Sequence, residues 1–175
     1  MQDDAAGDPP PTLLIVGLVI GVTAIVAILA IAATRQTPPP PVAIAAVPAP
    51  QANSPECQAL LATLPDQLGD LERATAAEPV PAGTAAWRNA GEPVIMRCGL
   101  DRPTEFVVGS PIQMVDDVGW FRLADAGLAR STWVSVDRPV YVALTLPDGS
   151  GPTPIQALSE VIGRTMPAIP IRPAR

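Results

Sequence analysis

A run of 21 uncharged residues from Leu13 to Ala33, without Pro, Asn or Gln, is the feature that most constrains this chain. At a rise of about 1.5 Å per residue, a helix of this length crosses the roughly 30 Å hydrocarbon core of a bilayer once. We therefore predict a single transmembrane helix over residues 13–34, after a short N-terminal tail over residues 1–12.

The same segment has a competing interpretation as a cleaved signal peptide, because Ala30-Ile31-Ala32 has the small-residue pattern of a cleavage site. The apolar region of a signal peptide is typically about 7–15 residues long and follows a positively charged start. Here the residues before the apolar run include three Asp and no Arg or Lys. We favour a retained anchor, and leave cleavage open as the alternative.

Within the apolar run, Gly17 and Gly21 have the small-xxx-small spacing that lets two membrane helices approach closely. This spacing makes the Gly17/Gly21 face a candidate for homodimer formation. Glycine is frequent in membrane helices in any case, so the alternative is that both residues are merely tolerated there.

Two sequence features give opposite indications of membrane orientation. Arg35, the basic residue next to the apolar run, favours a cytoplasmic C-terminal side. Cys57 and Cys98 form an even count that suits one disulfide in an oxidising compartment. We expect a cell-membrane protein whose C-terminal domain is extracytoplasmic. The alternatives are two unrelated buried thiols in a cytoplasmic domain, or a redox-active pair.

The remaining chain divides into three parts. Residues 35–52 are rich in Pro and Ala and should form an extended linker that holds the domain away from the membrane. Residues 53–167 are sufficient for one globular domain. Residues 168–175 are a Pro-containing tail, which we expect to be extended.

The domain should begin with a helix at Asn53-Ser54-Pro55-Glu56, where a capping side chain precedes Pro in the first turn. Cys57 and the following leucines share one face of this helix, and Leu68 and Leu71 are expected to continue it after Pro65. An amphipathic helix over residues 154–162 should close the domain.

Between these helices, short runs rich in β-forming residues predict strands. They cover residues 93–99, 106–108, 112–115, 120–123, 132–136 and 140–146. The last two are separated by the turn sequence Asp137-Arg138-Pro139 and should form a hairpin. The predicted fold class is α+β: a small, mostly antiparallel sheet flanked by an N-terminal and a C-terminal helix, and preceded by the transmembrane helix.

Composition excludes several classes of function. The chain contains no His, which removes Ser-His-Asp and Cys-His catalysis and His-based zinc sites. No Cys-x-x-Cys spacing suggests a metal site, and we expect no metal and no cofactor. From Asn53 onward, 14 acidic residues face 10 Arg, so the domain has no basic footprint for nucleic acid.

The sequence offers few candidate ligand-binding residues. Trp120 and Trp133 could stack on a sugar ring if they were exposed, although packing in the core explains them better. Asp137 and Arg138 could orient a ligand, or simply form a polar turn. Asp101, Asp116, Asp117 and Asp137 are the carboxylates that an envelope glycan or lipid hydrolase would use, but no catalytic residue is assigned.

Several motifs together resemble an actinobacterial, membrane-anchored family, domain of unknown function 3515. The most specific of them are Arg97-Cys98-Gly99 and the segment Asp137-Arg138-Pro139-Val140-Tyr141-Val142, and the resemblance extends from Pro48 to Pro167. It implies an envelope protein, either single-pass or exported, in which Cys57 and Cys98 are paired. It implies no activity. The acidic N-terminus departs from the basic flank expected before such an anchor.

The function that we predict is therefore a noncatalytic adaptor or interaction module of the cell envelope, with the membrane and an envelope protein as partners. The first alternative is a carboxylate-dependent hydrolase acting on envelope glycans or lipids. The second is a domain that binds a small ligand or a glycan, which would require an apolar pocket with a few convergent polar groups.

Overall fold

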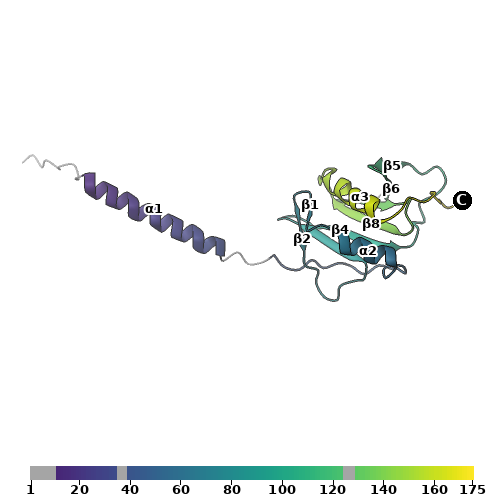
Figure 1. Ribbon diagram of the computed structural model, residues 1–175, viewed down its shortest axis with the longest axis horizontal. Helices are drawn as coiled ribbons and strands as arrows, with labels where there is room; N and C mark the ends of the chain where they lie inside the picture. The colour runs from purple at the N-terminus through teal and green to yellow at the C-terminus, as the bar shows by residue number, and fades with distance from the viewer. Residues whose placement is uncertain (1–10, 35–38, 124–128) are drawn as a thin grey trace, which may run out of the picture. The chain divides into compact units, whose positions relative to one another are not determined.

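A computed structural model of the chain describes residues 11–34, 39–123 and 129–175 (Figure 1). The chain forms two compact units, Met1–Pro39 and Pro40–Arg175. The first contains helix α1, Pro11–Thr34, and its Leu14–Ile31 segment is long and apolar enough to cross a membrane. A signal sequence near an N-terminus can also be this long and apolar, so the helix alone is weak evidence for a membrane span. The second unit starts inside the stretch that the sequence assigns to a linker.

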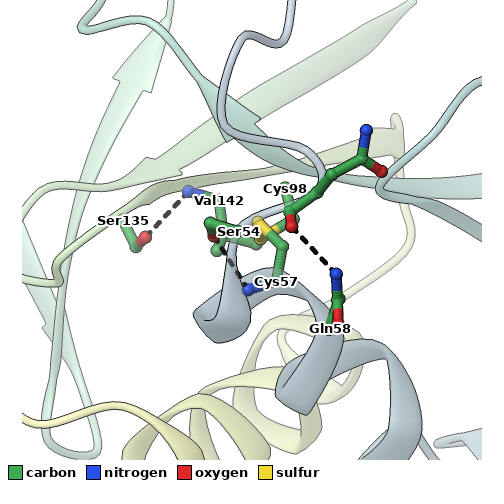
Figure 2. Close-up of a disulfide and its surroundings, with 7 residues drawn as sticks. Ser54, Cys57, Gln58, Cys98, Ser135 and Val142 are labelled. Atoms are coloured by element: carbon green, nitrogen blue, oxygen red, sulfur yellow. Dashed lines mark hydrogen bonds between the residues drawn. A yellow bond between two sulfur atoms is a disulfide. The ribbon is translucent and has the colours of Figure 1, made fainter.

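The predicted helix after Asn53 is confirmed as α2, Pro55–Thr63. The Ser54 hydroxyl caps it by accepting a hydrogen bond from the backbone N–H of Cys57 at 3.2 Å. Cys57 is fully buried and forms a disulfide with Cys98, with 5.7 Å between the Cα atoms (Figure 2). The pairing predicted for these two cysteines is therefore present, and it ties the start of α2 to the middle of the sheet.

The sheet has eight strands in the order β1-β2-β3-β4-β8-β7-β6-β5, and every neighbouring pair is antiparallel. Two four-stranded meanders are thus joined where β4 pairs with β8. The strands are β1 Gln67–Leu68, β2 Leu71–Ala74, β3 Thr84–Arg88, β4 Val94–Leu100, β5 Ile112–Val115, β6 Val118–Leu123, β7 Arg130–Ser135 and β8 Tyr141–Pro147.

Five of these strands lie where the sequence predicts them: β5 has the predicted bounds, and the ends of β4, β6, β7 and β8 differ from the predicted ones by at most two residues. Leu68 and Leu71 do not continue a helix. They lie in β1 and β2, and Gly69 between them has a positive φ of 64° that turns the chain into a hairpin. The strand expected over residues 106–108 is also wrong, since Val107 makes only an isolated bridge with Ala174.

Helices α2 and α3, Thr153–Thr165, cover one face of the sheet (Figure 1). The closing helix is therefore confirmed and extends beyond residues 154–162. Alternate residues of each central strand point into this core, because successive side chains of a strand lie on opposite faces. The shared core contains Trp87, Met96, Trp120 and Leu144, together with Leu158 and Ile162 of α3.

The opposite face is covered by irregular segments. The N-terminal strap, residues 40–48, places the buried side chains of Val42 and Ile44 against Ala86 and Ile95. Its backbone is fixed beside β2, where Val42 donates to the carbonyl oxygen of Thr75 at 2.8 Å. Farther along the sheet, Phe106 packs on Phe121 with 5.1 Å between ring centroids.

Candidate functional site

The largest cavity in the described part of the globular unit is a groove on this second face of the sheet. Its volume is about 1050 Å³, at the upper end of the roughly 300–1,000 Å³ typical of ligand pockets. It lies between the N-terminal strap and the loop of residues 100–105, where neither segment covers the central strands. We call it the sheet-face groove.

The floor of the groove consists of two rows of side chains that cross β4, β8, β7 and β6. Strand register aligns them, because residues paired across antiparallel strands present their side chains on the same face. The first row is Ile95, Thr145, Thr132 and Leu123, and the second is Arg97, Ala143, Val134 and Phe121.

The middle of this floor is low because its side chains are short. Ala143 and Thr145 alternate along β8 with Leu144 and Leu146, whose larger side chains point into the helix-side core. The hydroxyls of Thr132 and Thr145 lie 3.1 Å apart and bond to each other. The floor therefore combines depth with a polar pair at its centre.

The two walls come from segments without regular secondary structure. Val47 and Pro48 of the N-terminal strap form one wall, and the loop after β4 contributes the other through Asp101, Pro103, Thr104 and Glu105. Three residues after the strap, the chain is attached at Gly99, whose carbonyl oxygen accepts a hydrogen bond from the backbone N–H of Gln51 at 3.0 Å. Gly99 lies at a register shift in β4 and has a positive φ of 84°, a conformation that glycine adopts without steric cost.

Arg97 is the only charged residue in the two floor rows, and it is partly buried. Its Nη2 donates to the carbonyl oxygen of Ala45 at 3.4 Å, while its buried Nε has no hydrogen-bond partner among the described residues. Within the same part of the chain, no carboxylate forms an ion pair with it. Desolvation lowers the pKa of Arg97, because burial disfavours the charged form.

Charges of both signs surround this floor. Arg122 and Arg130 also line the groove, and Asp101 and Glu105 lie on the wall. Arg130 forms an exposed ion pair with Glu92 at 3.4 Å. The lining is therefore close to charge balance, and among its described residues neither Arg97 nor Arg122 forms an ion pair; the guanidinium of Arg122 lies instead over the ring of Trp133.

The structure does not assemble the candidate ligand-binding residues into one site. Trp120 is fully buried, and its indole N–H donates to the hydroxyl of Ser159 at 2.9 Å. Trp133 lines a second cavity of about 350 Å³ on the helix side of the sheet. One ring face of Trp133 carries the guanidinium of Arg122 at 5.7 Å, and the side chain also packs on the core. Trp120 therefore has no exposed face for stacking on a sugar, and the half-buried ring of Trp133 is in contact with Arg122.

Asp137 and Arg138 form a buried pair rather than an exposed ligand-orienting turn. The Asp137 carboxylate accepts a hydrogen bond from the backbone N–H of Gly119 at 2.8 Å and lies 3.1 Å from the Arg138 guanidinium. Arg138 also donates to the carbonyl oxygen of Asp117 at 2.6 Å. The pair thus connects the β7–β8 turn to the β5–β6 turn.

The carboxylates considered for hydrolysis are dispersed. Asp116 and Asp117 are exposed in the two-residue turn between β5 and β6, and Asp137 is buried in its ion pair. Asp101 alone of the four lines the groove, where Glu105 joins it. In the described ranges, Cys, Asp and Glu residues do not gather in a group of three that could hold a metal ion.

The sequence does not predict the groove, because its lining comes from four different strands and two irregular segments. Its signal is distributed: short side chains at alternate positions of β7 and β8, and an Arg inside the otherwise uncharged strand β4. Only the cross-strand register places Arg97 beside Ala143, 46 positions later in the chain.

Comparison with known proteins identifies a family but no activity. A family model described as a protein of unknown function (DUF3515) matches residues 18–171, so the chain belongs to this family, as the resemblance predicts. No curated protein and no solved structure matches the chain.

Proposed function

We propose, for a chain whose family has no assigned activity, that it is a noncatalytic interaction module of the cell envelope. In this proposal α1 anchors the chain in the membrane, the globular unit lies outside the cytoplasm, and the sheet-face groove binds a partner protein. The single observation that carries the proposal is the groove itself. It is large, and extended segments of the same chain already pack on either side of it.

The disulfide and the apolar helix support the location. Disulfides persist in oxidising compartments, which agrees with a globular unit outside the cytoplasm. The Leu14–Ile31 segment has the length and composition of a membrane anchor. Arg35 favours the opposite orientation, so the location requires the direct test described in the Discussion.

The composition of the groove favours binding over catalysis. A carboxylate-dependent hydrolase needs two carboxyl groups that flank the bond to be cleaved, roughly 5–10 Å apart. Asp101 and Glu105, the two carboxylates that line the groove, come from one short segment and are both exposed, which is the usual setting of solvated loop carboxylates. The glycan-binding alternative is weakened because Trp120 is fully buried and the half-buried ring of Trp133 is in contact with Arg122.

Photocrosslinking in intact cells tests the proposal. A photoreactive amino acid is placed at Thr104, an exposed residue on the groove wall, and at the control position Glu160, an exposed residue of α3 on the other side of the sheet. We expect a specific protein adduct from position 104 and none from position 160. Recovery of only the uncrosslinked chain, or of the same proteins from both positions, would argue against a groove-bound partner.

A further inference from the structure

We infer that the ligand of the sheet-face groove is an extended polypeptide segment with an acidic side chain, and that Arg97 receives this acidic group. The inference rests on the proposed function and specifies the chemistry of its partner. Three independent features of the groove support it.

The first feature is the unmatched charge of Arg97. A guanidinium that is partly removed from water, as that of Arg97 is, gains from pairing with an anion, because removing a charge from water is unfavourable. Arg97 has one long hydrogen bond to a neutral carbonyl oxygen, at 3.4 Å, and a buried Nε without a partner in the described structure. A carboxylate entering the groove would supply both the charge and the hydrogen-bond acceptors that this guanidinium lacks.

The second feature is that the same face already binds extended chain. The N-terminal strap inserts Val42 and Ile44 against the sheet and forms a parallel bridge between Val42 and Ala76. Arginine side chains of the sheet hold its carbonyl oxygens: Arg88 donates to Pro40 at 2.6 Å, and Arg97 donates to Ala45. An extended partner segment in the adjoining groove would use the same two kinds of contact.

The third feature is the charge balance of the lining, which selects among anionic ligands. Asp101 and Glu105 on the wall would repel a polyanion or a phosphate cluster, since like charges at close range are destabilising. A segment with one carboxylate and no other charge carries less negative charge than a polyanion. Asp101 and Glu105 therefore repel it less when its carboxylate approaches Arg97. The floor of Ala, Thr, Val and Ile suits the small and β-branched side chains of such a segment.

Peptide binding to the full-length protein in detergent tests the inference. The probes are short fluorescent peptides composed of Val, Thr and Ser, each made in two versions that differ only by a central Glu or Gln. We expect the Glu version to bind about tenfold more tightly than the Gln version, because hydrogen bonds between a guanidinium and a carboxylate are stronger than those to a neutral amide. In R97Q the preference should disappear, and in the control R164Q, an exposed Arg of α3, it should remain.

The outcomes separate this inference from the proposed function. Equal binding of the Glu and Gln versions, a preference that persists in R97Q, or binding of inorganic phosphate or anionic vesicles but of no peptide would each overturn it. The comparison of the two peptides on the wild-type protein holds even if R97Q folds poorly. If position 104 captures a protein partner in cells while the Glu preference is absent, the assignment of Arg97 fails and the interaction function stands.

Discussion

The carboxylate of Asp137 lies 3.1 Å from the guanidinium of Arg138, and both side chains are almost completely removed from solvent. The carboxylate also accepts the backbone N–H of Gly119, and the carbonyl oxygen of Asp137 accepts a hydrogen bond from Ile169 at 2.9 Å. Two turns and the C-terminal tail therefore meet at one buried ion pair, which makes Asp137 a residue of the fold and not of a ligand site.

We predict that D137A lowers the free energy of unfolding by about 3–5 kcal/mol, because it leaves the Arg138 charge buried without its partner. Urea denaturation of the full-length protein in detergent, followed by tryptophan fluorescence, measures this change. The control is E160A, which removes an exposed ion pair with Arg164 and should have little effect. A similar small effect in D137A would show that the pair contributes nothing to stability.

Removing the disulfide in the double variant C57A/C98A should lower stability by about 4 kcal/mol. The two cysteines are separated by 41 positions, and the loop that they close restricts the unfolded chain by roughly this amount in the chain-entropy model. The measurement is again urea denaturation, comparing the double variant with reduced and oxidised wild-type protein. Identical midpoints for oxidised wild type and the double variant would contradict the prediction.

Substituting Gly99 by Ala should destabilise the unit by about 2 kcal/mol or more. An added Cβ would overlap the backbone of Gln51 and Ala52, and the positive φ of 84° is unfavourable for alanine. Gly149 is the matched control: its φ of 82° is similar, but a Cβ there meets no atom within 4 Å. Thermal unfolding of G99A and G149A separates the two contributions, and equal losses would show that the contact with Gln51 is unimportant.

Topology is tested by labelling thiols in intact cells with a membrane-impermeant maleimide. If the globular unit is extracytoplasmic, Cys57 and Cys98 should react only after reduction, because the disulfide protects both sulfur atoms. Reaction without reduction would refute the bridge and keep the location. Reaction only after lysis, with no need for reductant, would place the unit in the cytoplasm and remove the basis for an envelope partner.

Periodicity was sufficient to predict the two helices of the globular unit and the strands with strong β-formers. It failed where the local sequence pattern favours a different structure from the one that strand pairing imposes. Leu64, Leu68 and Leu71 have helical spacing, but Gly69 turns the chain into a hairpin. Strand β3 is rich in Ala, which has low β-propensity, and its position depends on pairing with β4.

The site could be predicted far less well than the fold. Trp120 and Trp133 were selected as large aromatics, but both serve packing. In the sequence, Arg97 is distinguished only as a charged residue inside a strand. The residues that form the groove around it are distant in the chain: the strap precedes it by about 50 positions, and β8 follows it by more than 40. Such a site requires the cross-strand register, which no single segment encodes.

The position of the disulfide determines how the globular unit would respond to a pull on its N-terminal end. A pull that arrives through the N-terminal strap acts first on Pro40, held by Arg88, and then on Val42, which is held by two backbone hydrogen bonds of 2.8 Å, to Thr75 and from Ala77. Those bonds can open and let the strap peel away. The peeling cannot continue past Cys57, because a covalent bond there transfers the load directly to β4 in the centre of the sheet. Under tension, the wall of the groove formed by the strap can therefore detach from the sheet, while the floor that contains Arg97 stays in place.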